Sequence, residues 1–118
     1  MIIEDEPDAA ELFAEMMRLN GYRVLKAYAG GTAMALLTQE HPDVVLLDVM
    51  MPDISGIEVL RSIRSDPNLA LTPVVIVSAL ANPADISSGL SAGASAYLTK
   101  PVSYVDLVNA VGSLVNST

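Results

Sequence analysis

The chain has 118 residues, of which 52% are hydrophobic and 17% are charged, and this balance fits one folded domain with a single core rather than a disordered chain. The formal net charge of −8 argues against direct binding to nucleic acid, which depends on clustered lysine and arginine. Cysteine is absent, no apolar run approaches the roughly 20 residues of a membrane span, and we expect no signal peptide, so we predict a cytoplasmic protein without thiol chemistry or a membrane partner.

The first part of the chain is predicted to pair a short strand with a helix. Residues 1–3 form an apolar run that we interpret as a strand, and Pro7 suits the first position of a helix. Asn20-Gly21 is expected to end this helix. Its apolar face is predicted from five side chains, those of Leu12, Phe13, Met16, Met17 and Leu19.

The next part repeats this alternation. Residues 22–27 are predicted as a strand, Gly30-Gly31 interrupts it, and residues 32–40 are predicted as a helix. Residues 43–48 contain a continuous run of valine and leucine, which is typical of a strand buried on both faces of a parallel sheet.

A loop with Pro52 and Gly56 follows, and the helix after it reaches Asp66-Pro67. Residues 73–77 are predicted as a second buried strand. The helix over residues 57–65 is expected to bury Ile57, Leu60 and Ile63.

The end of the chain supplies one more helix, a strand and a last helix. Residues 83–92 are predicted as a helix that Gly93 stops, residues 97–99 as a short strand, and residues 103–115 as a helix. The core side of this last helix is predicted to carry Leu107, Val108, Val111, Leu114 and Val115. A strand followed by a helix, five times over, predicts an α/β fold in which a parallel sheet carries helices on both faces and is joined by right-handed crossovers.

The residues at the predicted strand ends are those that could carry chemistry, because sites in parallel sheets lie beyond the carboxyl ends of the strands. Glu4-Asp5 follows the first strand, Asp48 ends the third, Ser78 follows the fourth and Lys100 follows the fifth. Three neighbouring carboxylates stay ionised only if a cation lies among them, and their oxygens suit Mg²⁺. A metal, an ammonium and a hydroxyl together match the charge of a phosphoryl group in transfer.

Asp48 is the best candidate nucleophile, because it ends the central buried strand and a carboxylate can form an aspartyl-phosphate. Taken singly, each of these residues has an ordinary structural interpretation. An acid can complement a helix dipole or cap a turn, a loop serine can be a satisfied hydroxyl, and a lysine can be solvated. Only the joint arrangement favours a functional site.

The residues resemble the response-regulator receiver family over essentially the whole chain. The resemblance rests on a series of motifs in the family's order and spacing. They are Ile3-Glu4-Asp5-Glu6-Pro7, Val45-Leu46-Leu47-Asp48-Val49-Met50-Met51-Pro52, Gly56, Val77-Ser78-Ala79, Gly93-Ala94 and Tyr97-Leu98-Thr99-Lys100-Pro101. It implies a flavodoxin-like, doubly wound (βα)5 fold with strand order 2-1-3-4-5, and a single receiver domain over residues 1–118.

The resemblance also implies roles for individual residues. Asp48 would be the phosphorylation site, and Mg²⁺ or Mn²⁺ would be bound by Asp5, Asp48 and the backbone carbonyl of Met50, with Glu4 acting through water. Phosphoryl oxygens would be contacted by three groups, namely the Ser78 hydroxyl, the Ala79 backbone N–H and the Lys100 ammonium.

Tyr97 would be the switch aromatic that turns inward when Ser78 moves toward the phosphate, and the Lys100-Pro101 bond would be cis. The phosphoryl donor would be the phosphohistidine of a histidine kinase or phosphotransfer protein. The output would pass to a downstream protein or a fused output domain. Such a chain catalyses only its own phosphorylation and dephosphorylation and is not otherwise an enzyme.

Two features depart from the family pattern. Only residues 1–3 precede the acidic pair, where the family has a longer first strand, so we expect that Met1 is not the natural start or that the chain is trimmed. From Pro83 onward the charged side chains are Asp85, Lys100 and Asp106 alone. We therefore hypothesise that the surface of the fourth helix, fifth strand and fifth helix binds through apolar and small polar contacts.

Three other interpretations stay open. A haloacid-dehalogenase-like phosphatase would need a second aspartate two positions after Asp48, where Met50 stands. A flavodoxin-like cofactor binder would place phosphate against the loop Glu4-Asp5-Glu6, which repels it. A receiver-like interaction module that is never phosphorylated is the strongest alternative, although such modules usually lack one of the site residues and this chain lacks none.

Overall fold

A parallel β-sheet forms the centre of the fold. The computed structural model describes residues 1–115, and within them five strands pair in the order β2-β1-β3-β4-β5, all in parallel. The strands are β1 (Ile2–Ile3), β2 (Lys26–Ala27), β3 (Val45–Leu47), β4 (Val74–Ser78) and β5 (Ala96–Thr99). The predicted α/β class, the strand order 2-1-3-4-5 and the alternation of strands with helices are confirmed.

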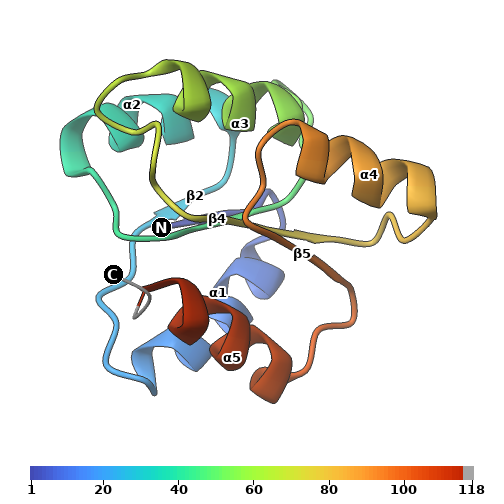
Figure 1. Cartoon of the computed structure of the whole chain (residues 1–118). Coiled ribbons are helices and arrows are strands. Elements are labelled where there is room, and N and C mark those ends of the chain that lie inside the picture. The colour runs from blue at the N-terminus through green and yellow to red at the C-terminus, as the bar shows by residue number, and fades with distance from the viewer. Residues whose placement is uncertain (116–118) are drawn as a thin grey trace.

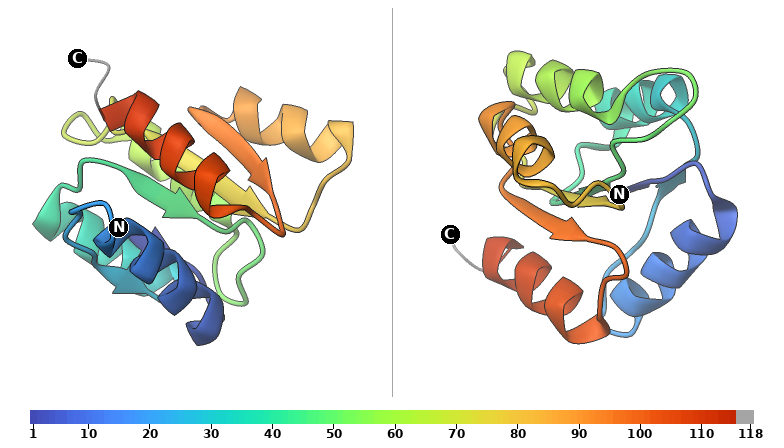
Figure 2. Two further views of the ribbon diagram at one scale, coloured as in Figure 1. Left: turned by 90° about the horizontal axis from the view of Figure 1, so that it is seen from below. Right: turned by 90° about the vertical axis from the view of Figure 1, so that its right-hand side faces the viewer.

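Helices cover both faces of this sheet. They are α1 (Pro7–Arg18), α2 (Gly30–Glu40), α3 (Gly56–Ser65), α4 (Pro83–Ser91) and α5 (Tyr104–Val115). α2, α3 and α4 lie on one face, and α1 and α5 lie on the other (Figure 1). The two turned views in Figure 2 show the same layers. Within residues 1–115, none of the helices combines the length and apolar character needed to span a bilayer.

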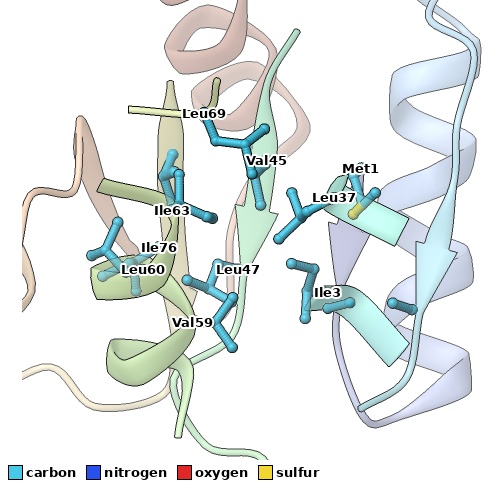
Figure 3. Close-up of a cluster of buried hydrophobic side chains, with 13 residues drawn as sticks. Met1, Ile3, Leu37, Val45, Leu47, Val59, Leu60, Ile63, Leu69 and Ile76 are labelled. Atoms are coloured by element: carbon cyan, nitrogen blue, oxygen red, sulfur yellow. The ribbon is translucent and has the colours of Figure 1, made fainter. Parts of the chain in front are cut away.

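The core consists of two layers that the sheet separates. β3 and β4 are buried along their whole length, as expected for central strands with helices on both sides. Successive side chains of a strand point to opposite faces. Val45 and Leu47 therefore pack toward α2 and α3 (Figure 3), while Leu46 packs toward α1 and α5.

The buried face of α1 differs from the predicted one. Its buried residues are Ala10, Phe13, Ala14 and Met17, which recur at positions i, i+3, i+4 and i+7. Leu12 and Leu19, predicted to face the core, are 55% and 75% exposed. The prediction counted large side chains and overlooked the two alanines, whose small size lets the helix lie close to the sheet.

Several element boundaries also differ from the predictions, and the differences at β2 and α2 have clear structural reasons. β2 contains only Lys26–Ala27, instead of residues 22–27, because its partner β1 offers only Ile2 and Ile3 for pairing. α2 begins at Gly30, so Gly30-Gly31 belongs to the first turn of the helix instead of preceding it. The predicted core side of α5 is confirmed, since Leu107 and Val111 are buried and the other three residues pack against the same cluster.

A half-buried arginine connects the loops at the amino edge of the sheet, where the strands begin. Arg64, in the last turn of α3, donates hydrogen bonds to the carbonyls of Gly93 (2.9 Å), Ala70 (3.1 Å) and Thr72 (2.6 Å). Gly93 has φ of 113° and lies against the Arg64 side chain. Burial lowers the pKa of the Arg64 guanidinium, but the three carbonyls keep its donors satisfied. One side chain thus connects α3, the loop before β4 and the turn after α4.

We expect Arg64→Met to lower the free energy of unfolding by about 2 kcal/mol, because it leaves three carbonyls without their charged donor. Urea denaturation followed by circular dichroism measures the loss. Arg61→Met is the matched control, because Arg61 is an exposed arginine of the same helix, and it should change the free energy by less than about 0.5 kcal/mol. Equal effects of the two substitutions would contradict the connecting role of Arg64.

Candidate functional site

The site lies where the strands end. Glu4 and Asp5 follow β1, Asp48 follows β3, and Lys100 follows β5. Backbone hydrogen bonds fix these positions, because the N–H of Asp48 donates to the Ile3 carbonyl at 2.9 Å and the N–H of Lys100 donates to the Ser78 carbonyl at 2.8 Å. The parallel sheet therefore brings residues that are up to 96 positions apart in sequence to one edge.

Three carboxylates converge at this edge. One oxygen from each of Glu4, Asp5 and Asp48 lies within 4.8 Å of the others. Glu4 and Asp48 are only 1% and 7% exposed, and Asp5 is half-buried. Burial and the neighbouring Asp48 carboxylate raise the pKa of Glu4 to about 7, against the opposing effect of Lys100. The cluster holds more negative charge than its surroundings compensate.

Lys100 is the cation of the site. Its Nζ donates a hydrogen bond to Glu4 Oε1 at 2.5 Å and lies 3.6 Å from Asp48 Oδ2. Partial burial lowers the pKa of Lys100, but the hydrogen bond to Glu4 and the charges of Asp48 and Glu4 raise it by more, so the ammonium stays charged. The peptide bond between Lys100 and Pro101 is cis, as the resemblance implied.

The carboxylate cluster fits a hard divalent cation. Lys100 offsets one of the three negative charges, and the converging oxygens are the donors that Mg²⁺ prefers. Met50 is the remaining expected ligand, through its backbone carbonyl. Its N–H donates to Asp48 Oδ1 at 3.1 Å, so its backbone lies beside the cluster, while its side chain is 56% exposed.

The loop after Asp48 folds back tightly against it. The N–H of Gly56 donates to the Val49 carbonyl at 2.9 Å. A Cβ at Gly56 would lie 2.3 Å from the Asp48 carbonyl oxygen, so no larger residue fits there without a shift of the backbone. Ser55 caps α3, because its Oγ accepts the Ile57 N–H at 3.2 Å.

Ser78 and Tyr97 both contact Leu80, a residue that sequence reasoning missed. The buried Ser78 Oγ accepts the Leu80 N–H at 3.1 Å, and the Tyr97 O–H donates to the Leu80 carbonyl at 2.7 Å. Ala79, between Ser78 and Leu80, is exposed. No sequence signal could have found Leu80, because both contacts use its backbone and not its side chain.

Asp53 is a second residue that the sequence did not reveal. Its two carboxylate oxygens accept the N–H groups of Gly30 and Gly31, each at 3.0 Å, at the start of α2. The amides of Gly31, Gly30 and Ile54 lower the pKa of Asp53 to about 2, so this carboxylate is ionised at neutral pH. The available signal was Ala29, which stands where a capping side chain would be expected.

Comparison with known proteins agrees with this geometry. The family model for the response regulator receiver domain matches residues 1–112. The Mycobacterium tuberculosis "Probable transcriptional regulatory protein TcrX" is 38% identical over 119 residues, which are 100% of this chain and 50% of TcrX. Protein PilH of Pseudomonas aeruginosa is 36% identical over 115 residues, 98% of this chain and 95% of PilH. The receiver domain of the Francisella response regulator 1452 has a TM-score of 0.91 at 32% identity, covering 98% of this chain and 94% of the other.

A five-stranded parallel sheet with acids gathered at its carboxyl edge defines an α/β protein of the flavodoxin-like architecture with an acidic site at the strand ends. The chain belongs to the response regulator receiver domain family. It is therefore a receiver domain of two-component signalling, a phosphoacceptor rather than an enzyme, and its family implies a histidine kinase as partner. The cluster of Glu4, Asp5 and Asp48 is consistent with a phospho-aspartate site.

The Tyr97 ring is packed against a glycine of α4. A Cβ at Gly89 would lie 2.9 Å from the ring atom Cδ2 of Tyr97 and 2.9 Å from Cδ1 of Ile76. Gly112 in α5 has no such neighbour, since a Cβ there would have nothing within 4 Å. The two helical glycines therefore form a natural pair for comparison.

We expect Gly112→Ala to stabilise the fold by up to about 1 kcal/mol, the usual gain of alanine over glycine in a helix. Gly89→Ala should lose that gain and destabilise the fold by about 1 kcal/mol, because the new methyl group crowds Tyr97 and Ile76. Urea denaturation measures both, and NMR signals of the Tyr97 ring should shift only in the Gly89 variant. Equal stabilisation of the fold by both substitutions would show that the Tyr97 ring is not tightly packed against Gly89.

Proposed function

We propose that Asp48 accepts a phosphoryl group from the phosphohistidine of a histidine kinase or phosphotransfer protein, in a reaction that requires Mg²⁺. The observation that supports this is the position of the Asp48 carboxylate, buried beside Glu4 and Asp5 and 3.6 Å from the Lys100 ammonium. Residues 1–118 are proposed to act as one receiver unit.

The proposed transfer is a displacement at phosphorus. A carboxylate oxygen of Asp48 forms the new P–O bond while the P–N bond of the phosphohistidine breaks, and the bonding pair leaves on the imidazole nitrogen of the donor. Asp5, Asp48 and the Met50 carbonyl would hold Mg²⁺, with Glu4 acting through water, and the bound ion would supply the positive charge that the carboxylates and the phosphoryl oxygens need to lie together. Mn²⁺ is expected to substitute, because it accepts similar ligands.

The protein's own donors stabilise the charge that the phosphoryl group brings. That group carries about −1.5 to −2 charges at neutral pH. The ammonium of Lys100 can bind a phosphoryl oxygen in place of its present contacts with Glu4 and Asp48. The Ser78 hydroxyl and the Ala79 N–H are proposed to donate to the other oxygens.

The switch is proposed to pass through Leu80. When Ser78 turns toward the phosphoryl group, the Leu80 N–H loses its acceptor, and the carbonyl of the same residue holds the Tyr97 hydroxyl. Leu80 lies two residues before Asn82, whose side chain caps α4 by accepting the Asp85 N–H at 2.9 Å. A movement of this loop therefore reaches both Tyr97 and the start of α4, and changes the surface formed by α4, β5 and α5.

The output of the switch is proposed to be another protein surface. The chain spans half the length of TcrX but nearly the whole length of PilH. Either a fused output domain or a separate downstream protein is therefore compatible with the relatives. The formal charge of −8 does not favour direct contact of this domain with nucleic acid.

We expect incubation with acetyl phosphate and Mg²⁺ to add the mass of one phosphoryl group, detected by intact mass spectrometry. Asp48→Asn should abolish the gain, and so should removal of the divalent cation with a chelator. Asp43→Asn is the matched control, because Asp43 is an exposed aspartate just before the same strand, at its opposite end. If no donor phosphorylates the chain, the interaction module without phosphorylation becomes the better interpretation.

We also expect the α4-β5-α5 surface to bind with little dependence on salt. Its exposed apolar side chains include Leu90 (47%) and Val105 (61%), and few charges accompany them. Where the phosphorylated chain associates through this surface, sedimentation should give an association constant that changes about twofold or less between roughly 0.05 and 0.3 M salt. A strong loss of association with salt would point to ion pairs instead.

A further inference from the structure

The loop between β3 and α3 lies against the first turn of α2, which is 22 to 23 residues from Asp53 in sequence. Asp53 accepts two N–H groups of that turn, from Gly30 and Gly31, at 3.0 Å each. α2 has no cap of its own, because Ala29 occupies the capping position and the first turn contains no acid. The loop therefore supplies a cap that most helices obtain from the residue that precedes them.

A second contact fixes the same loop on the same turn. A Cβ at Gly30 would lie 2.7 Å from Cβ of Ile54, so the Ile54 side chain rests where a side chain of residue 30 would be. Gly31 is less tightly placed, because a Cβ there would meet only Asp53 Oδ2, at 3.6 Å. Only glycine at position 30 lets Ile54 approach this closely. A side chain at position 31 would not block the approach.

The inner part of the loop carries the proposed metal ligand. Met50 donates its N–H to Asp48 Oδ1, and Gly56 donates its N–H to the Val49 carbonyl. Pro52, directly before Asp53, restricts the backbone between these bonds and the outer contact. The loop is therefore held at its base near Asp48 and at its tip on α2, and the Met50 carbonyl lies between these two attachments.

We propose that Asp53 is a positioning residue for the divalent cation, which holds the Met50 carbonyl in place by anchoring the loop to α2. This inference rests on the proposed function, because it assumes that the cation binds at Asp5, Asp48 and Met50. Residues that orient metal ligands typically change metal affinity about 10- to 100-fold when they are removed. We expect Asp53→Ala to weaken Mg²⁺ binding about tenfold.

Loss of the cap and loss of the anchor can be separated. Asp53→Ala removes both, whereas Asp53→Ala combined with Ala29→Ser restores a cap to α2 but leaves the loop unattached. Ala29 has the extended backbone that a capping residue adopts, with φ of −153° and ψ of 155°. The double variant should recover the stability of the parent in urea and still bind Mg²⁺ about tenfold more weakly. Recovery of affinity together with stability would overturn the proposal.

A glycine pair tests the anchor without removing a charge. Gly30→Ala should displace the loop through Ile54 and weaken Mg²⁺ binding several-fold, while Gly31→Ala, which makes the same chemical change one residue later, should not. Mg²⁺ titration followed by NMR measures affinity. Amide hydrogen exchange at Val49, Met50 and Met51 in the metal-free protein should be faster in the Asp53 and Gly30 variants. Unchanged exchange and affinity in these variants would overturn the proposal.

A failure of the proposed function and a failure of the Asp53 role would give different results in these experiments. If the unaltered protein shows no Mg²⁺ binding, the proposed function fails. If the unaltered protein binds Mg²⁺ and the Asp53 variants bind it equally well, only the positioning role of Asp53 fails. Half-maximal phosphorylation by acetyl phosphate should require about tenfold more Mg²⁺ in Asp53→Ala than in the unaltered protein, and an unchanged requirement would also count against the positioning role.

Discussion

Mutual repulsion among the carboxylates of Glu4, Asp5 and Asp48 is the constraint on which the organisation of this protein depends. The parallel sheet forces these groups together, because the ends of β1 and β3 are neighbours whose positions backbone hydrogen bonds determine. Lys100 approaches from β5 and compensates only part of the charge. Buried carboxylates are tolerated only when they are protonated, paired or coordinated, and the arrangement therefore supports the proposed binding of a divalent cation.

The two loops beside this cluster differ in how they are held. The loop after β3 is attached at its base and, through Asp53 and Ile54, to α2. The loop after β4 is held through the backbone of Leu80. The Leu80 N–H donates a hydrogen bond to Ser78, and the Leu80 carbonyl accepts one from Tyr97. A stationary loop suits the binding of a metal, whereas a loop held by bonds to the residues that are proposed to move suits the transmission of a signal.

Sequence patterns predicted the fold well because they depend on local periodicity and on rules of connection. The buried runs of β3 and β4, the helix starts at Pro7 and Pro83, and the alternation of strands with helices were all correct, whereas the strand order came from the resemblance to the receiver family. The face of α1 was correct for Phe13 and Met17 but wrong for Leu12 and Leu19, because alanine contributes little to a count of large apolar residues although it packs well. The convergence of Glu4, Asp5, Asp48 and Lys100 followed from the topology. The contacts of Leu80 and Asp53 did not, because Leu80 acts through its own backbone groups and Asp53 accepts backbone N–H groups that lie 22 and 23 residues earlier in the chain.

Arg64 bears on how α4 can respond to a change at Asp48. The guanidinium holds the Gly93 carbonyl directly after α4, so the far end of this helix is tethered to α3 and to the loop before β4. Its near end begins at Asn82, close to the loop that Ser78 and Tyr97 hold. With one end pinned and the other adjacent to the site, α4 would pivot about Gly93 instead of sliding along the sheet. A displacement at Leu80 would then move the first turn of α4 most and the turn near Gly93 least.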